Sequence, residues 1–100
     1  MIREITLDEL EDILADGAEL IDVREEDEVE AGAIPGHKHM ALSEFDTFKD
    51  EISQTKTTVF YCRSGARSMK ACQMAEEWTD QQICSLAGGY LAWAEENETT

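Results

Sequence analysis

Short segments with the pattern of β-strands recur along the chain. Four of them predict strands at residues 19–23 (ELIDV), 38–42 (KHMAL), 57–62 (TTVFYC) and 82–86 (QICSL), and a less clear one lies near residues 3–5. The third is almost continuously apolar, which is typical of a strand covered on both faces. We therefore expect residues 57–62 to lie near the centre of a sheet.

Helical patterns separate these strands. Apolar Leu10, Ile13 and Leu14 share one face of a predicted helix at residues 7–17, which Gly17 ends. Further helices are predicted at residues 43–52, 68–78 and 88–97. The only proline, Pro35, lies in the loop-like segment AGAIPGHK, and no helix is predicted between residues 23 and 38.

The order of these elements determines the expected fold class. Strands that alternate with helices predict an α/β domain in which a mostly parallel five-stranded sheet is covered by helices. The chain has 100 residues, no internal repeat and no low-complexity linker. We therefore expect a single domain, residues 1–100, around one hydrophobic core.

Charge and composition narrow the range of partners. The formal net charge of −15 argues against binding to nucleic acid or to an anionic membrane surface, because both would repel the chain. No apolar run approaches the roughly 20 residues of a membrane-spanning helix, and the acidic N-terminal segment lacks the pattern of a secretory signal. We expect a cytoplasmic protein that has neither a nucleic-acid nor a membrane partner.

The three cysteines, Cys62, Cys72 and Cys84, form no CxxC pair, and their odd number fits a reducing compartment better than a disulfide framework. Cys72, in a helical pattern, and Cys84, in a strand pattern, are interpreted as core residues, with a resolving thiol as the alternative for either. His37 and His39 lack a third metal ligand and are interpreted as loop or surface residues. We expect no metal and no cofactor.

Cys62 differs from the other two cysteines in its surroundings. It ends the predicted central strand, and residues 56–75 include four cations and neither Asp nor Glu. Ligands gather at the carboxyl ends of the strands in such sheets, where the amides of the next loop, with flexible Gly65, and a helix N-terminus can cradle an anion. These donors, together with Arg63 and Arg67, predict a nucleophilic thiolate with a lowered pKa. The alternative is a cysteine that only packs in the core.

Three motifs resemble those of the rhodanese family of sulfurtransferases. CRSGARS, residues 62–68, is similar to the family's active-site loop, and LIDVREEDEVEAGAIPGH, residues 20–37, resembles its early strand, its Asp-x-Arg step and its GHIPGA turn. CSLAGGYLAW, residues 84–93, resembles its closing segment. Departures from the family pattern, none of them in the cysteine loop, are Glu26, Val29, Ala33 and Ala87.

The resemblance implies a rhodanese-like fold, with helices on both faces of the sheet, and a sulfurtransferase activity. Cys62 would take sulfane sulfur from a small anionic donor, form a persulfide, and pass the sulfur to cyanide, a small thiol or a protein cysteine. Thiosulfate is the favoured donor because the loop has the form C-R-x-G-x-R, with Arg63 in place of the glycine of mercaptopyruvate users.

The resemblance also assigns roles around Cys62. Donor binding falls to the loop residues Arg63, Ser64, Gly65, Ala66, Arg67 and Ser68. Asp22 and Arg24, at the end of an earlier strand, are expected to support this loop, with a structural ion pair as the simplest role. We expect the domain to act as a monomer.

Two alternatives remain for this loop. Phosphatases that share the fold place arginine six positions after the cysteine, where this chain has Ser68; its arginine comes one residue earlier, at Arg67. The shorter loop is predicted to be too tight for a phosphate group. In the other alternative the chain is a non-catalytic persulfide carrier or a regulatory docking module, whose acidic surface selects a basic protein partner.

Overall fold

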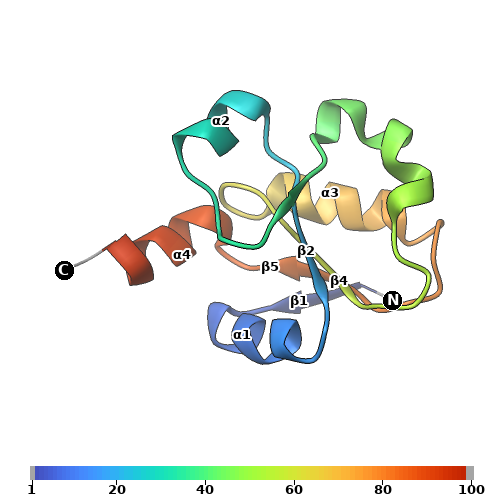
Figure 1. The fold of residues 1–100 in the computed structure, drawn as a ribbon, viewed down its shortest axis with the longest axis horizontal. Coiled ribbons are helices and arrows are strands. Elements are labelled where there is room, and N and C mark those ends of the chain that lie inside the picture. Colours follow the sequence, from blue (N-terminus) through green and yellow to red (C-terminus); the bar gives the residue numbers. More distant parts are fainter. Residues whose placement is uncertain (1, 99–100) are drawn as a thin grey trace.

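Five parallel strands form a single sheet in the computed structural model, which describes residues 2–98 (Figure 1). The strand order is β1-β5-β4-β2-β3, and every neighbouring pair is parallel. The strands are β1 (Ile2–Ile5), β2 (Glu19–Asp22), β3 (Lys38–His39), β4 (Thr58–Tyr61) and β5 (Ile83–Leu86). The predicted α/β class is confirmed, and β4 lies at the centre between β5 and β2, as its continuous apolar run indicates.

Helices cover both faces of this sheet (Figure 1). They are α1 (Leu7–Ala15), α2 (Glu26–Ala31), α3 (Ala66–Ala75), α4 (Gly89–Glu98) and the 3-10 helix η1 (Leu42–Glu51). The pleat of β4 sends Val59 and Tyr61 into the cluster that includes residues of α1 and α4, and sends Phe60 into the cluster with residues of α3 and η1. Cys62, the next residue, also belongs to the α3 and η1 cluster.

Apart from shifts of one to three residues at element ends, the structure differs from the predicted elements in three places. α2 was not predicted, because none of its six residues is buried and it therefore has no apolar stripe; the capping box of Glu25 and Glu28 marks its start instead. The helix expected at residues 43–52 is a 3-10 helix, with a kink at Glu44. β3 has only two residues, where residues 38–42 were predicted.

Cys72 and Cys84 both lie in the core, which confirms the interpretation of their packing. They belong to the clusters on opposite faces of the sheet, and both are free thiols. Burial raises the pKa of Cys72 to about 12, so this thiol is neutral at physiological pH. Within residues 2–98, no helix has the length and apolarity that crossing a bilayer requires.

Thr58, the first residue of β4, carries an unpaired polar group. Its side chain is fully buried, and its Oγ1 has no hydrogen-bond partner among the residues that the structure describes. A buried hydroxyl without a partner is destabilising, because it has lost its bonds to water. Thr79, which is 8% exposed, makes a useful contrast because its hydroxyl donates to the Ser53 carbonyl at 2.9 Å and accepts from the Gln81 amide at 3.1 Å.

We predict that Thr58→Val, which replaces the hydroxyl with a methyl group of similar size, raises the free energy of unfolding by about 1 kcal/mol. Urea denaturation of the two proteins measures the difference. Thr79→Val is the matched control and should lower the same free energy, since it removes a hydroxyl that has two partners. A Thr58→Val protein less stable than the wild type would show that the hydroxyl is satisfied in solution.

Candidate active site

Cys62 is the centre of the candidate site, and it follows the last residue of the central strand directly. Its Sγ accepts hydrogen bonds from the backbone amides of Gly65, at 3.1 Å, and Ser68, at 3.3 Å. The chain can fold back on the sulfur in three residues because Gly65 adopts a φ of +128°, which residues with a Cβ rarely adopt. The loop therefore presents its amides to the thiol, as the sequence predicts.

Ser68 adds a side-chain hydroxyl to this arrangement. It lies in the first turn of α3, is fully buried, and places its Oγ 3.7 Å from Cys62 Sγ. The same hydroxyl donates to the Gly65 carbonyl at 3.0 Å. Ser85, on the neighbouring strand β5, reaches it from the other side, with 2.8 Å between the two Oγ atoms. Three polar groups therefore meet at Ser68 Oγ.

Opposing effects act on the pKa of Cys62. Burial raises this pKa, because it disfavours the charged thiolate. Hydrogen bonds from the Ser68 amide and hydroxyl, and from the Gly65 and Ser64 amides, outweigh burial and lower the pKa below its ordinary value. A lowered pKa of Cys62 is what the sequence predicts. The sequence, however, also predicts that Arg63 and Arg67 contribute to the lowering.

The arginines are arranged differently from that expectation. The side chain of Arg63 is exposed. Arg67 donates from Nη1 and Nη2 to the two carboxylate oxygens of Glu28, at 2.7 and 2.9 Å. These bonds raise the pKa of Arg67, to which attraction by the Cys62 thiolate also contributes, and they lower the pKa of Glu28 to about 2. Arg67 therefore acts on the sulfur from a distance, while its forked contact is made with α2.

Glu28 was missed as a site residue, because no helix was predicted around it. One of its carboxylate oxygens, Oε1, also accepts a bond from the Glu25 amide at 3.1 Å, so the carboxylate is held both by its own helix and by Arg67. Ser85 was missed as well, although a serine inside a buried strand is a signal that a hydrogen-bond partner lies nearby. Both partners lie far from the loop in the sequence.

The other side of the loop is held by the start of α4. The Tyr90 amide donates to the Cys62 carbonyl at 2.8 Å, and the Leu91 amide to the Arg63 carbonyl at 3.1 Å. This close approach explains Gly89, where an added Cβ would lie 2.3 Å from the Cys62 carbonyl oxygen. Gly89 of the closing motif therefore lets α4 start against the active loop, residues 62–68.

Asp22 and Arg24 form the ion pair expected of them, and they form it with each other. Both are buried, and Arg24 Nη2 donates to Asp22 Oδ2 at 2.7 Å and to the Gly32 carbonyl at 2.6 Å. The guanidinium lies 4.3 Å from the centre of the Tyr90 ring and 5.6 Å from that of Tyr61. The pair thus connects the end of β2 with α4, the helix that holds the loop.

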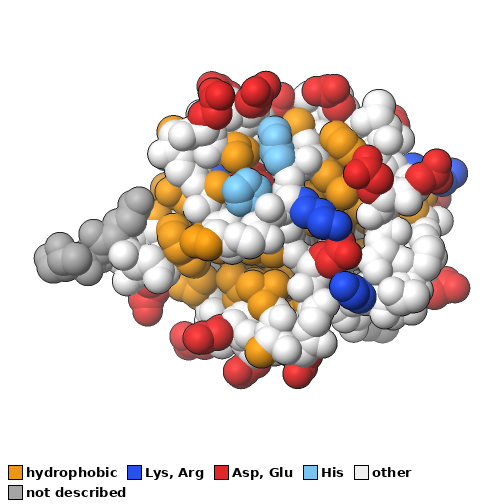
Figure 2. Space-filling view, in the orientation of Figure 1, with side chains coloured by type: hydrophobic (Ala, Val, Ile, Leu, Met, Phe, Trp, Pro, Cys, Tyr) orange, Lys and Arg blue, Asp and Glu red, His pale blue; other side chains and the backbone are white. Residues whose placement is uncertain are grey.

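The two histidines are surface groups on the face shown in Figure 2. One ring nitrogen of His37 lies 2.9 Å from the Ile34 carbonyl, and one of His39 lies 2.6 Å from the Arg24 carbonyl. Among residues 2–98, no group of three or more His, Cys, Asp or Glu side chains is placed to hold a metal ion.

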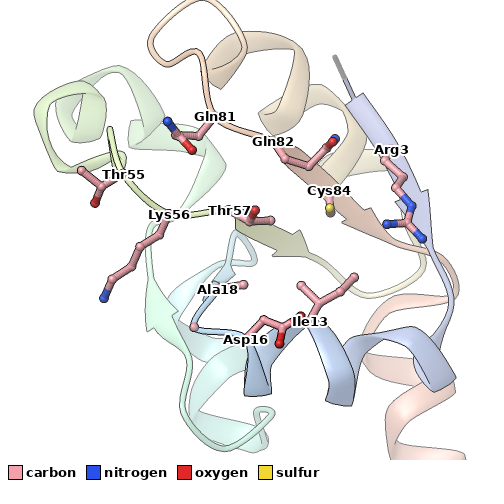
Figure 3. A pocket seen from close by; sticks show the side chains of 11 residues that line it. Arg3, Ile13, Asp16, Ala18, Thr55, Lys56, Thr57, Gln81, Gln82 and Cys84 are labelled. Atoms are coloured by element: carbon pink, nitrogen blue, oxygen red, sulfur yellow. The ribbon is translucent and has the colours of Figure 1, made fainter.

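Two hollows lie at opposite ends of the parallel strands. One, of about 490 Å³, adjoins the active loop and is lined by Glu25, Leu42, Ser43, Arg67, Lys70 and Met74. The other, of about 300 Å³, includes Arg3, Thr57 and Cys84 in its lining (Figure 3). Thr57 precedes β4 whereas Cys62 follows it. Of these two hollows, only the first therefore lies at the carboxyl ends of the strands, beside the Cys62 loop.

Comparison with known proteins agrees with this geometry. The model of the rhodanese-like domain family matches residues 6–96. A sulfurtransferase of Allochromatium vinosum is 34% identical over 96 residues, which cover 94% of this chain and 90% of the relative. The human thiosulfate:glutathione sulfurtransferase is 33% identical over 106 residues, which cover 91% of this chain and 92% of the relative.

The fold is shared with solved structures as well. The crystal structure of a rhodanese-related protein from Thermoplasma volcanium superposes with a TM-score of 0.85 at 25% identity, covering 95% of this chain and 93% of that one. The match of the family model extends over most of the chain, including the cysteine loop and the elements that hold it. The chain therefore belongs to the family of rhodanese-like domains.

Proposed function

We propose that this domain is a sulfurtransferase that moves sulfane sulfur from a donor such as thiosulfate to a thiophilic acceptor through a persulfide on Cys62. The observation that carries the proposal is the sulfur itself, which lies at a strand end with the Gly65 and Ser68 amides donating to it. The sulfurtransferase relatives support the reaction class. The same donors suit each anionic sulfur species that forms in the loop.

The proposed cycle has two displacements. In the first, the Cys62 thiolate attacks the sulfane sulfur of thiosulfate, the S–S bond of the donor breaks, and sulfite leaves with the electron pair. In the second, cyanide or a thiolate attacks the terminal sulfur of the persulfide, and Cys62 leaves as the thiolate. No proton has to be transferred within either displacement, so the task of the loop is to stabilise negative charge.

Arg67 is proposed to assist the first displacement. A guanidinium has five N–H donors, and the bonds to Glu28 use two of them. The remaining donors are available to the oxygens of a thiosulfate dianion and of the departing sulfite. Glu28 sets the position of the guanidinium and also neutralises part of its charge, so Arg67 and Glu28 act on the donor together.

The alternative is a carrier or docking module whose partner is another protein. Asp and Glu side chains gather over α2 and η1 on the face shown in Figure 2. The Arg67 and Glu28 contact places α2 beside the active loop, so a partner that reaches Cys62 meets this acidic surface. Stable sulfur loading with transfer only to a basic protein would favour the carrier, whereas rapid turnover with cyanide favours the enzyme.

We predict that incubation with thiosulfate, followed by removal of the reagent, adds the mass of one sulfur atom to the wild-type protein and none to Cys62→Ser. Intact-mass spectrometry measures the gain, and cyanide should remove it. Peptide mapping is the control: Cys72 and Cys84 should stay unmodified, because burial raises the pKa of both thiols and keeps them neutral. A sulfur adduct of equal yield in Cys62→Ser would contradict the assignment of Cys62.

Arg67→Ala should lower kcat/KM for thiosulfate by roughly ten- to a thousandfold, because it removes a charge-assisted contact to the donor. Arg67→Lys should recover only part of the loss, since an ammonium group cannot pair with two donor oxygens in the forked geometry of a guanidinium. Cyanide discharge of preloaded Cys62 should change much less. Steady-state ping-pong kinetics separate the two half-reactions, and equal losses in both would mean that the loop has collapsed.

Glu28 provides the matched variant for this experiment. Arg67→Ala leaves the Glu28 carboxylate without the guanidinium that it contacts at 2.7 Å, and an uncompensated anion beside the loop repels thiosulfate. The double variant Arg67→Ala/Glu28→Gln should therefore recover part of the activity lost in Arg67→Ala. If the double variant is no better than the single one, repulsion by Glu28 makes no contribution.

The spacing of the loop predicts that aryl phosphates are not hydrolysed at an enzyme-like rate. Arg67 follows Cys62 by one residue fewer than the phosphatase pattern requires, so the loop is expected to be too tight for a phosphate group around the sulfur. Release of the phenol from an aryl phosphate measures the rate, with Cys62→Ser as the blank. Cys62-dependent hydrolysis with turnover would contradict the prediction.

A further inference from the structure

Ser85 is a buried polar residue in the middle of an apolar strand. It is 1% exposed, and its neighbours in β5 are Cys84 and Leu86. The alternation of the strand directs Ser85 to the face opposite to these neighbours, where its Oγ lies 2.8 Å from Ser68 Oγ. Among the described residues, no hydrogen bond joins Ser85 to Cys62. Any effect of Ser85 on the sulfur therefore passes through Ser68.

The hydrogen bonds at Ser68 are limited by the single proton of its hydroxyl. In the thiol state this proton is donated to the Gly65 carbonyl, at 3.0 Å. The two lone pairs of Ser68 Oγ can then accept one bond from the Cys62 thiol, at 3.7 Å, and one from the Ser85 hydroxyl. Every group is satisfied, and Ser68 Oγ has two donors.

Removing the proton from Cys62 changes this balance. The thiolate has no proton to donate and instead attracts the Ser68 hydroxyl, whose proton can turn from the Gly65 carbonyl to Sγ. Of the donors to Ser68 Oγ among the described residues, only Ser85 then remains. The oxygen that now donates to the sulfur is also polarised by the bond it accepts.

We propose that Ser85 is a positioning residue that donates to Ser68 Oγ while Cys62 carries negative charge, and so directs the Ser68 proton to the sulfur. The thiolate is the first such state. The persulfide is the second, since its inner sulfur also has no proton to donate, and this part rests on the proposed function. Because the thiol keeps a second donor on Ser68 and the charged states do not, loss of the Ser85 hydroxyl weakens the charged states selectively.

Charged and titratable groups on the surrounding elements act in the same way with or without Ser85. Arg67 is paired with Glu28, Asp22 is paired with Arg24, and Arg63 is exposed. These groups on the elements around the loop include Asp22, Arg24, Glu25, Glu28, His39, Tyr61, Arg63, Arg67, Lys70, Cys72 and Tyr90. None of these side chains is bonded to Ser85 in the described structure, so substituting Ser85 leaves their contacts in place.

The experiment measures the rate of Cys62 alkylation by iodoacetamide as a function of pH, with the Cys62 peptide followed by mass spectrometry. In Ser85→Ala the thiolate loses stabilisation, so the profile should shift to higher pH. At pH values below the pKa of Cys62, alkylation should be roughly three- to tenfold slower than in the wild type. The rate at the high-pH plateau should be unchanged. A general loosening of the loop would alter the plateau as well.

Three further variants make the result specific. Ser85→Thr keeps the hydroxyl and should restore the wild-type profile. Thr58→Val removes a buried hydroxyl from the neighbouring strand that has no described partner, and should leave the profile unchanged. In a Ser68→Ala background, adding Ser85→Ala should produce no further shift, because the proposed effect passes through Ser68.

The proposal is overturned if the Ser85→Ala profile coincides with that of the wild type, or if the shift is as large in the Ser68→Ala background. Should Ser85→Ala fail to fold, Ser85→Cys, which has similar size and a weaker donor, must show a smaller shift in the same direction, and an unshifted profile overturns the proposal equally. Alkylation requires no sulfur transfer, so this result stands apart from the thiosulfate-loading experiment that tests the proposed function.

Discussion

The structure of the site depends on one constraint: a thiol with a lowered pKa is placed where burial opposes its negative charge. Cys62 is 1% exposed, because it follows the central strand of the sheet, and burial alone would keep it a neutral thiol. Hydrogen bonds from Ser68, Gly65 and Ser64 outweigh the effect of burial and lower the pKa of Cys62 below its ordinary value. The position of the thiol therefore requires a loop whose amides point inward, and the inward-pointing amides in turn require a glycine where φ is +128°.

A loop of this kind is stable only if its outward-facing carbonyls are also satisfied. The first residues of α4 supply the donors, since the Tyr90 and Leu91 amides bond to the Cys62 and Arg63 carbonyls. Tyr90 in turn packs its ring on the Arg24 guanidinium, which is held by Asp22 at the end of β2. The end of β2, the end of β4 and the start of α4 thus meet at a single loop, which explains why the family's motifs are spread over most of the chain.

The sequence predicts the reactive residue better than its partners. Cys62 could be identified because the continuous apolar run of β4, the glycine and the absence of nearby acids are local features. Glu28 and Ser85 could not be placed, because each meets the loop through the tertiary fold, 39 residues from Arg67 and 17 residues from Ser68 respectively. The same limit explains the role given to the arginines, since their spacing shows that positive charge lies near the loop and cannot show that Glu28 already pairs with Arg67. α2 was missed because a short exposed helix has no apolar periodicity.

The acidity of the chain conflicts with the proposed anionic donor only if charge is counted over the whole surface. At physiological ionic strength the Debye length is about 8 Å, so acids on remote elements are largely screened from an ion in the loop. The groups that determine the binding of an anion are those within hydrogen-bond distance, and around Cys62 these are amides and a hydroxyl. Among the acids, Glu28 is the exception to this screening, because it is in direct contact with Arg67 at the loop. Under the proposed function, the balance between the Arg67 guanidinium and the Glu28 carboxylate therefore has more influence on donor choice than the net charge of −15. The net charge would act instead on a large partner, whose surface would meet many acids at once.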